Sequence, residues 1–489
     1  MRNKVLAGAA WMVALKWAFR LLGLINTMVL ARLLTPEDFG IVAISMALIG
    51  ILDSFFDFGF GLALIKNQNA TREDYDVAWS LRLANMVLFG LSIALLSPLV
   101  AMYSDTPETI AISLVLALSI VMRGLENIGT VDFQKDLEFS SVFKLQVLSK
   151  TLSIATTILL AVLLQTYWAI IIGFLTSAFY TVSFSYLLSP FRPRLLFKGI
   201  GGIWNFSKWV LLTNMARQLF YSLDKLLLSG LVSKAQLGFY NVSGSLASIV
   251  TVELLSPIGS ALMPGFAKLQ GDRQRLQAAF VQSLAVLFAV ILPAGVGVWL
   301  IAPELVRVIL GSQWHDAAKL VALFGILATL SSLAETISNF MAMSGLIAKS
   351  ARVGLTRTSL FLAGFYFAFH AGGLEGVILF KAALELLEVI TLLQVSASFL
   401  NLPSASLLKI TWRPAVAVTV MGLTLHMLAP WFTGNAYIDL FAKAMVGAST
   451  YVSSSLLMWK MAGKPGGLES LALDLIFNKL ARRLRSAAH

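Results

Sequence analysis

Residues 278–302 read AAFVQSLAVLFAVILPAGVGVWLIA, an apolar run without a single charged side chain. A helix that crosses the hydrocarbon core of a bilayer needs about 20 consecutive, mostly apolar residues. The run is long enough, and it lacks the period-two alternation of a strand. An open sheet, in addition, cannot span lipid. The run therefore predicts a membrane-spanning helix.

Similar runs fill the rest of the 489-residue chain, of which 58% is apolar and only 13% is charged. A soluble domain is typically about 45–50% apolar and about 25% charged. A soluble fold of this composition could not hide its apolar surface, because a large share of its residues must face water. We predict an all-α integral membrane protein, and not a soluble enzyme.

Cutting the sequence at charged and Pro/Gly-rich segments gives about 14 candidate spans. They cover residues 8–30, 39–64, 77–101, 109–128, 142–164, 168–188, 207–230, 238–263, 278–302, 317–343, 353–370, 374–400, 412–430 and 437–459. The first follows a short basic N-terminus but is too long for the apolar part of a signal peptide, so we predict that it is retained as a helix.

Lys and Arg predict the orientation, since cytoplasmic loops carry an excess of both. With the N-terminus in the cytoplasm, the outer segments hold only Arg32, Lys234, Arg307 and Lys319, and most other loop cations lie inside. We predict a multi-pass protein with both termini in the cytoplasm. Because these flanking residues explain the net charge of +12, nucleic acid is not an expected partner.

Metal, thiol and ATP chemistry have no support in the sequence. The chain has no cysteine, which excludes disulfides, thiolate ligands and a Cys nucleophile. There is no GxxxxGK[ST] string for a nucleotide phosphate. None of the four histidines has a second His or a carboxylate at metal-ligand spacing: His315, His370, His426 and His489.

The sequence repeats itself at an offset of 198 residues. Residues 33–40 read LLTPEDFG between the first two spans, and residues 231–238 read LVSKAQLG between the seventh and eighth, with Ser45 and Ser243 following in register. Six helices per half is an even number, so both halves enter the membrane in the same direction. The axis relating them then runs along the membrane normal.

This repeat predicts two six-helix bundles related by a pseudo-two-fold axis, with a central cleft between them and two further C-terminal helices. The predicted organisation is an N-terminal bundle over 1–190, a cytoplasmic linker over 191–206, a C-terminal bundle over 207–400, helices 13 and 14 over 401–460, and a basic cytoplasmic tail over 461–489. The acidic pair Glu37–Asp38 is predicted to begin the second helix after Pro36, where carboxylates suit free N–H groups, and not to be catalytic.

Charged side chains inside the spans need an explanation, because each costs about 2.5–3.5 kcal/mol at the bilayer centre. Lys16 and Arg20 share one face of the first helix, and Asp53 and Asp57 share one face of the second. At about 1.5 Å per residue the two pairs lie at matching depths. They form either a structural ion-pair ladder or one that opens and closes during transport.

Other charged residues within the predicted spans need the same kind of explanation. Arg217 and Glu253, on the seventh and eighth spans, lie at comparable depth. Arg82 has no carboxylate within one helical turn, so it either reaches the cytoplasmic face or faces the cleft as a free cation. Lys150 and Lys443 share this ambiguity. Two further sets are predicted to pair within their own helix: Arg123 with Glu126, and Lys381 with Glu385 and Glu388.

Prolines inside three of the spans are predicted to kink their helices, and neighbouring groups can satisfy the carbonyls that each proline leaves without a donor. These prolines are Pro98, Pro257 and Pro293.

Three strings carry a resemblance to a known family. LARLLTPEDFG at 30–40 resembles the helix 1–2 signature of polysaccharide flippases, and FQKDLEF at 133–139 and LGFYN at 237–241 resemble two further signatures. The chain is thus similar, from its first to about its twelfth helix, to Wzx-type flippases of the multidrug/oligosaccharidyl-lipid/polysaccharide (MOP) exporter superfamily. It resembles in particular the subgroup that handles exopolysaccharide units such as colanic or teichuronic acid.

The resemblance implies two six-helix bundles around a V-shaped cavity, alternating access, and a bacterial cytoplasmic (inner) membrane. It implies that the chain flips undecaprenyl-pyrophosphate-linked oligosaccharides for lipopolysaccharide or exopolysaccharide biosynthesis. The expected partners are the bilayer, this lipid-linked substrate, and a polysaccharide polymerase with its chain-length machinery. No catalytic residue, metal or cofactor is expected beyond a coupling proton or sodium ion.

The polyprenol tail can remain in lipid while the sugars and pyrophosphate enter the cleft. Guanidinium groups bind phosphate oxygens through paired donors. The candidate substrate-binding cations are Arg20, Arg82 and Arg217, with Lys16, Arg123 and Lys225 beside them. Of these, Arg20 matches approximately a position at which lipid II flippases of the same superfamily need an arginine. The candidates for a coupling ion or ion pair are Asp53, Asp57, Asp224 and Glu253.

Two rival functions remain open. An ion-coupled drug or cation antiporter of the same superfamily would need an acidic cavity. An integral membrane polymerase or glycosyltransferase would need a sizeable outer loop with catalytic acids, and the longest outer loop here, near residues 303–316, is short. A pure scaffold would leave the intramembrane charges unexplained.

Overall fold

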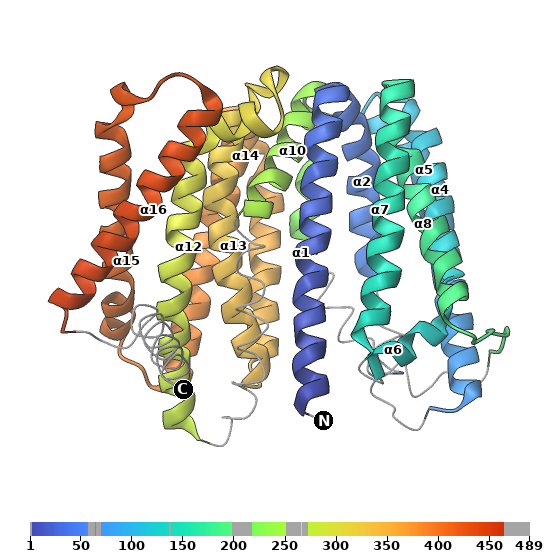
Figure 1. Ribbon diagram of the computed structural model, residues 1–489, viewed down its shortest axis with the longest axis horizontal. Coiled ribbons are helices and arrows are strands. Elements are labelled where there is room, and N and C mark those ends of the chain that lie inside the picture. The colour runs from blue at the N-terminus through green and yellow to red at the C-terminus, as the bar shows by residue number, and fades with distance from the viewer. Residues whose placement is uncertain are drawn as a thin grey trace, which may run out of the picture. The chain divides into compact units, whose positions relative to one another are not determined.

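The computed structural model describes residues 2–56, 64, 70–135, 138–197, 218–250, 266 and 272–463. These residues contain helices and connecting turns but no strand, as Figure 1 shows. The chain divides into two compact units, Met1–Val242 and Ser243–His489.

The described part of the first unit is built mainly from long helices. They are α1 (Arg2–Leu33), α2 (Pro36–Phe56), α4 (Arg72–Tyr103), α5 (Glu108–Gly124), α7 (Phe139–Leu164) and α8 (Trp168–Leu188), followed by helical residues 218–229 and by α10 (Lys234–Val250), inside which the unit ends. A 3-10 turn, Ile128–Thr130, and the short α6 (Val131–Lys135) connect α5 to α7, and Figure 1 shows α6 lying across the lower end of α7.

From residue 272 to 463, the second unit continues with four uninterrupted helices and one broken helix. These are α12 (Arg273–Ile309), α13 (Ala317–Met343), α14 (Ile347–Leu400), α15 (Ser404–Met427) and α16 (Ala436–Met461). The helix α14 is broken at Gly372 and Gly373, and the φ of +57° at Gly373 is a conformation that favours glycine. Its two arms fold back on each other, since a Cβ at Gly364 would lie 2.4 Å from the ring of Phe380.

The observed helices follow the predicted spans closely. Residues 168–188 and 317–343 coincide with α8 and α13, and the break in α14 separates the predicted spans 353–370 and 374–400. The predicted spans over 207–230 and 238–263 are described only in part. The described helices that are long and apolar enough to cross a membrane include the windows 14–33, 72–103, 140–164, 168–188, 273–309 and 317–343. The prediction of an all-α membrane protein is confirmed.

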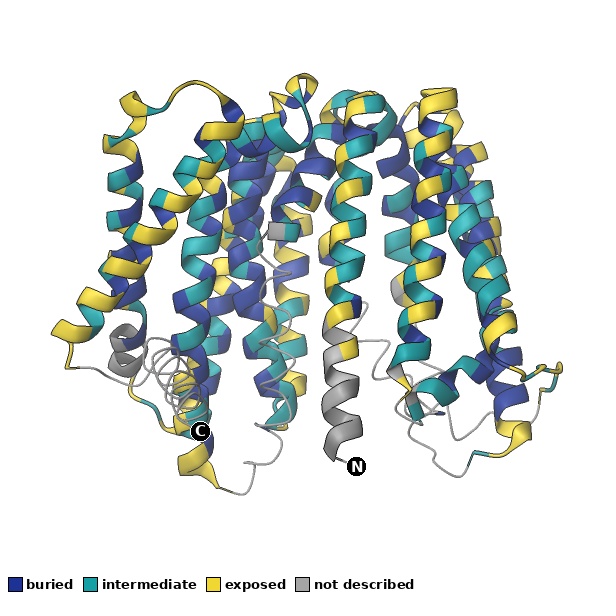
Figure 2. Cartoon of the chain, in the orientation of Figure 1, coloured by how far each residue is buried: buried dark blue, intermediate teal, exposed yellow. Residues whose placement is uncertain are grey.

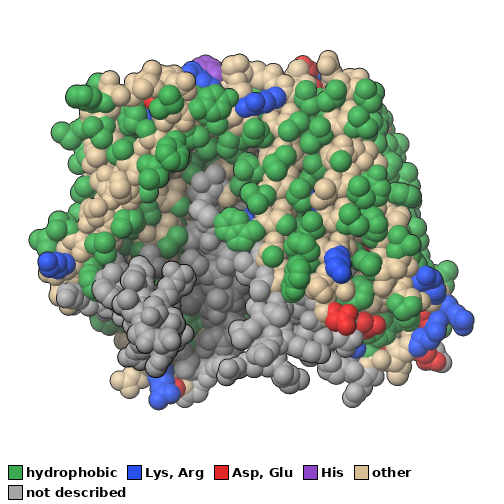
Figure 3. Space-filling view, viewed as in Figure 1, with side chains coloured by type: hydrophobic (Ala, Val, Ile, Leu, Met, Phe, Trp, Pro, Cys, Tyr) green, Lys and Arg blue, Asp and Glu red, His purple; other side chains and the backbone are tan. Residues whose placement is uncertain are grey.

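Figure 2 shows buried and exposed residues on different sides of the described helices. On α4 the exposed stripe recurs at helical spacing and consists of Leu88, Leu91, Leu95, Leu99 and Met102, with Leu95 78% and Met102 80% exposed. Figure 3 shows hydrophobic side chains covering the middle of the visible helix surfaces. An exposed apolar surface of this extent is a liability in water but suits contact with lipid tails.

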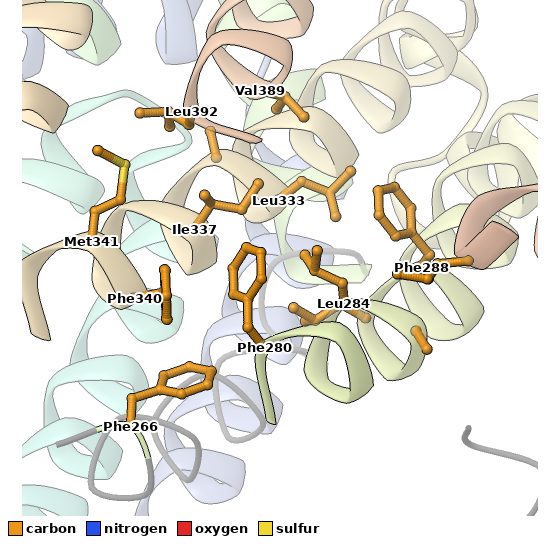
Figure 4. Close-up of a cluster of buried hydrophobic side chains, with 14 of the residues drawn as sticks. Phe266, Phe280, Leu284, Phe288, Leu333, Ile337, Phe340, Met341, Val389 and Leu392 are labelled. Carbon is orange, nitrogen blue, oxygen red and sulfur yellow. The ribbon is translucent and has the colours of Figure 1, made fainter. Parts of the chain in front are cut away.

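The packed core of the second unit lies between α12, α13 and α14. Phe280 of α12 packs on Phe340 of α13, with 4.2 Å between ring centroids, and Leu284, Leu333 and Ile337 surround them (Figure 4). Small residues bring helix backbones close elsewhere, as they commonly do in membranes. A Cβ at Gly173 of α8 would lie 2.1 Å from Oγ1 of Thr157, a side chain of α7.

At two of the three predicted prolines, a side-chain hydroxyl donates to the carbonyl that the proline leaves without a helical donor. Pro98 leaves the carbonyl of Ala94 without its helical donor, and Oγ of Ser97 donates to that carbonyl at 3.0 Å. Pro293 likewise frees the carbonyl of Ala289, and the hydroxyl of Tyr451 on α16 donates to it at 2.7 Å. Thus α16 satisfies the backbone of α12. Pro257 lies outside the described residues.

Candidate substrate-binding site

The two copies of the sequence repeat adopt the same local structure. Helix α2 begins at Pro36 and α10 begins at Lys234, which are equivalent at the offset of 198. Before α2, the backbone N–H of Thr35 donates to Asp38 at 2.9 Å and that of Asp38 donates to Oγ1 of Thr35 at 3.3 Å. This reciprocal capping box satisfies N–H groups that the first helical turn leaves open. Glu37 and Asp38 thus belong to the first turn of α2, as predicted.

The second copy has an equivalent capping box. The backbone N–H of Ser233 donates to Oε1 of Gln236 at 3.1 Å, and the N–H of Gln236 donates to Oγ of Ser233 at 3.2 Å. Ser233 and Gln236 stand at the same offset from Thr35 and Asp38. The internal repeat is therefore confirmed where the two helices begin.

The two repeat-equivalent glycines, Gly40 and Gly238, lie in one close crossing of α2 and α10. A Cβ on Gly40 would lie 1.7 Å from the carbonyl oxygen of Lys234, and a Cβ on Gly238 would lie 1.9 Å from that of Pro36. Both glycines belong to the short motifs that carry the family resemblance. Backbone therefore packs directly on backbone here, and only glycine fits at either position.

Further contacts join the surrounding helix ends at this side of the first unit. Lys234 forms an ion pair with Glu108 of α5 at 3.8 Å. The hydroxyl of Tyr103, at the end of α4, donates to the carbonyl of Leu227 at 2.8 Å. Asp38 also accepts from the N–H of Tyr167, which precedes α8, at 3.0 Å. The helix ends on this side of the first unit are thus tightly connected.

Arg82 is ion-paired in the structure, not a free cation. Its Nη2 donates to Glu126 at 2.5 Å and to the backbone carbonyl of Arg123 at 2.9 Å. The predicted pairing of Arg123 with Glu126 is therefore wrong. The carboxylate of Glu126 lies beyond the end of α5 and binds the guanidinium of Arg82 from the neighbouring α4.

The remaining cations predicted for the first unit lie on α1 and on residues 218–229. Lys16 and Arg20 are partly buried on α1, which packs chiefly against α7, and Lys225 is also partly buried. Asp53 is exposed on α2, which packs chiefly against α4 and α5. The ladder between the first two helices stays a prediction.

Asp224, a predicted coupling or pairing group, is buried and contacts a signature residue. It is 2% exposed, and its Oδ2 accepts a hydrogen bond from the hydroxyl of Tyr240 on α10 at 2.6 Å. Tyr240 belongs to the LGFYN string. The other predicted site residues, Asp57, Arg217 and Glu253, lie outside the described residues.

A second buried ionic cluster lies between the arms of α14. Nη1 of Arg357 donates to Oε2 of Glu385 at 2.7 Å and also contacts Glu388, and all three side chains are less than 9% exposed. Lys381 lies nearby, with its Nζ 5.5 Å from the ring centroid of Phe361. The two glutamates thus take a guanidinium from the preceding arm. Their predicted pairing with Lys381 on their own helix stays a prediction.

Arg357 was missed as an intramembrane group by sequence reasoning, although it lies inside the predicted span 353–370. The next span, 374–400, carries Glu385 and Glu388, so the sequence could have indicated Arg357 as their partner. Lys443, left ambiguous above, donates to Glu304 of α12 at 2.7 Å and so joins α16 to α12. Among the described residues, no group of three or more His, Asp or Glu side chains could hold a metal ion.

The FQKDLEF string lies at the end of the first unit where α4 begins. Lys135 donates to the hydroxyl of Tyr75 at 3.1 Å, and that hydroxyl also contacts Asp132. Asp76 accepts from the N–H of Arg194 at 2.8 Å, which ties the extended segment after α8 to α4. The signature thus positions the connection between α5 and α7 against α4, while its residues 136 and 137 lie outside the described ranges.

Lipid-facing helices with charged groups buried between them define a polytopic membrane protein of transporter architecture. The fold agrees with this class. The structure matches that of the lipid II flippase MurJ in an inward closed conformation, with a TM-score of 0.71, over 92% of this chain and 99% of that chain at 15% identity. At this identity the match shows the fold.

The family follows from the sequence comparison. Residues 29–319 match the model of the family described as "Polysaccharide biosynthesis protein", and the chain belongs to that family. It is 23% identical over 394 residues to the lipopolysaccharide biosynthesis protein WzxC of Escherichia coli (strain K12), covering 80% of each chain. It is 24% identical over 471 residues to the succinoglycan biosynthesis transport protein ExoT of Rhizobium meliloti (strain 1021), covering 93% of each chain. The predicted family is confirmed.

Proposed function

We propose that this protein is a flippase that carries undecaprenyl-pyrophosphate-linked oligosaccharide units from the cytoplasmic to the outer leaflet of the bacterial cytoplasmic membrane. Membership of the polysaccharide biosynthesis family supports the pathway, and the lipid II flippase fold supports the movement of a lipid carrier. The protein is a transporter and not an enzyme, in line with these relatives. The units that it moves serve lipopolysaccharide or exopolysaccharide assembly.

The observation that carries the proposal is the excess of basic groups within the helices of the first unit. In the predicted spans 8–30, 39–64, 77–101, 109–128 and 142–164, the described carboxylates are Asp53 and Glu126. The basic side chains of the same spans are Lys16, Arg20, Arg82, Arg123, Lys144 and Lys150. Cations placed within a membrane are costly unless a bound anion offsets them, and a pyrophosphate supplies that anion.

The energy source follows from the charge of the cargo. An anion that moves outward runs with an inside-negative membrane potential, which is worth about 2.3 kcal/mol per charge per 100 mV. We propose that a proton or sodium ion adds to this drive, with Asp53, Asp57, Asp224 and Glu253 as candidate binding groups. We also propose that both termini face the cytoplasm and that a polysaccharide polymerase and its chain-length machinery receive the flipped units.

The test is flipping in proteoliposomes. The full-length protein is reconstituted with a fluorescent polyprenyl-pyrophosphate oligosaccharide, and the fraction reached by a membrane-impermeant quencher is followed over time. We expect movement with the wild-type protein and a severalfold slower rate for Arg20→Gln. The matched control is Arg275→Gln, which removes an arginine whose side chain is 78% exposed at the start of α12.

One result would contradict the proposed function, and a second would contradict only the role of Arg20. If the lipid does not move but organic cations cross under an ion gradient, the protein is an antiporter. If Arg20→Gln and Arg275→Gln both flip at the wild-type rate, Arg20 is not part of the path, although the flippase function stands.

A further inference from the structure

Helix α13 carries a single carboxylate, Glu335, well inside its length. The whole helix, Ala317–Met343, is long and apolar enough to cross a membrane. At about 1.5 Å per residue, Glu335 lies about 7.5 Å from Leu330 at the middle of the helix, within a hydrocarbon core about 30 Å thick. Glu335 is exposed, although most of the apolar window of α13 is buried.

Glu335 stands on the side of α13 that points away from the core of the second unit. Leu333 and Ile337 belong to the core between α12, α13 and α14 (Figure 4). With 3.6 residues per turn, both stand about 160° round the helix from Glu335. The exposed apolar residue Ile326, nine residues before Glu335, stands about 180° from it. The exposed carboxylate and the apolar residues of α13 therefore lie on opposite sides.

Polar side chains continue the side of α13 that carries Glu335. Ser331 stands about one turn before Glu335, and Ser338 and Asn339 stand about one turn after it. Ser331 is 8% exposed, and its Oγ has no hydrogen-bond partner among the described residues. Ser338 and Asn339 are partly buried, and Ser338 accepts a hydrogen bond from Ser350 of α14 at 3.1 Å. This side of α13 is thus polar over about two turns.

A side of this composition does not suit lipid. Ionisable side chains in membrane-spanning segments are costly in hydrocarbon, and they almost always face the interior of the helix bundle or a water-filled cavity. The packed core lies on the opposite side of α13, with Leu333 and Ile337. The exposed carboxylate of Glu335 therefore faces water at membrane depth. In a transporter, water at this depth belongs to the path of the substrate.

We propose that Glu335, with Ser338 and Asn339, binds hydroxyl groups of the oligosaccharide while the lipid-linked substrate crosses the membrane. This inference rests on the proposed function, and it gives the second unit a part in recognising the sugar. A carboxylate accepts hydrogen bonds from more than one hydroxyl, and bonds to a charged acceptor are stronger than bonds between neutral groups. The amide of Asn339 both donates and accepts, as sugar hydroxyls do.

The spacing and the charge of this set both favour a sugar over a diphosphate. Residues four apart on a helix have Cβ atoms about 5–6 Å from each other, so one sugar can reach both Glu335 and Asn339. A carboxylate repels a diphosphate, because like charges repel and the repulsion is stronger at low dielectric constant. The charged part of the substrate is therefore held by other groups.

The test is flipping in proteoliposomes by the full-length protein. Two fluorescent polyprenyl-diphosphate lipids are compared below saturation, one with an oligosaccharide and one with a single sugar. We expect Glu335→Ala to slow the oligosaccharide lipid about tenfold or more, and Glu335→Gln and Asn339→Ala to slow it less. The single-sugar lipid should lose less, because it offers fewer hydroxyl groups. The matched control is Glu375→Ala, the same chemical change at a side chain of α14 that is 39% exposed, and it should flip both lipids as the wild type does.

Thermal unfolding of the same variants separates sugar binding from folding. Because Glu335 is exposed and stands away from the core, Glu335→Ala should unfold at about the same temperature as Glu375→Ala. A clearly lower unfolding temperature, with both lipids slowed equally, would give Glu335 a structural role and overturn the sugar site.

Other outcomes are also decisive. Wild-type rates for both lipids in Glu335→Ala overturn the sugar site and leave the proposed function standing. If Glu335→Gln only abolishes the response of flipping to a proton or sodium gradient, and the difference between the two lipids is unchanged, Glu335 couples an ion and does not bind sugar. If the wild-type protein moves organic cations and no lipid, the proposed function and the sugar site both fail.

Discussion

Because α2 and α10 cross closely at Gly238, we expect Gly238→Ala and the same substitution at an open position to have very different effects on the unfolding temperature. In Gly238→Ala the new methyl carbon would lie 1.9 Å from the carbonyl oxygen of Pro36 and 2.8 Å from its carbonyl carbon. Non-bonded heavy atoms prefer about 3.5–4.0 Å, so the two helices must separate by about 1.5–2 Å. Both obstructing atoms are backbone and cannot rotate away.

The matched control is Gly23→Ala on α1, where a Cβ would meet no atom within 4 Å. Both glycines are helical, so alanine gains about 0.5–1 kcal/mol of backbone entropy in either case. At Gly238 the forced separation costs about 1–3 kcal/mol or more, which outweighs that gain. We therefore expect Gly238→Ala to lower the unfolding temperature and Gly23→Ala to raise it or leave it unchanged.

The assay is thermal unfolding of the detergent-solubilised protein, followed by intrinsic tryptophan fluorescence. Gly40→Ala provides a replicate from the other half of the repeat, because its Cβ would lie 1.7 Å from the carbonyl oxygen of Lys234. If Gly238→Ala and Gly40→Ala are both as stable as Gly23→Ala, the backbone-to-backbone contact is absent from the protein, and the reasoning fails.

Two further substitutions test buried polar contacts in the second unit by the same assay. Tyr451→Phe removes the donor to the carbonyl of Ala289 that Pro293 leaves open, and it should cost about 0.5–1.5 kcal/mol; no loss would mean that another donor replaces it. Arg357→Met leaves Glu385 buried without its cation and should cost about 3–5 kcal/mol; a loss below about 1 kcal/mol would show that the cluster is already neutral or hydrated.

The membrane class and the places of most described helices could be read from the sequence, because both depend on local properties. Apolar runs predict spans through their length and composition alone, and the spans 168–188 and 317–343 match α8 and α13 to the residue. The capping residues of the repeat act within one helical turn, so Thr35 with Asp38 and Ser233 with Gln236 could be located from the chain. Three short strings were enough to indicate the family.

Sequence reasoning failed where two helices had to be placed side by side. Glu126 stands three residues from Arg123, yet it pairs with Arg82 on another helix. Glu385 and Glu388 bind a guanidinium from the other arm of α14, which spacing along their own helix does not indicate. Spacing along one helix shows which charges share a face, but not what faces them.

The sequence by itself thus determined an all-α membrane protein, its repeat and its family, because hydropathy, capping and signature strings are written in consecutive residues. The tertiary structure decided which charges pair across helices, such as Arg82 with Glu126. It also decided that Gly40 and Gly238, each the last residue of its repeat segment, meet in one helix crossing. These outcomes depend on the rotation and separation of packed helices, which no periodicity along the chain specifies.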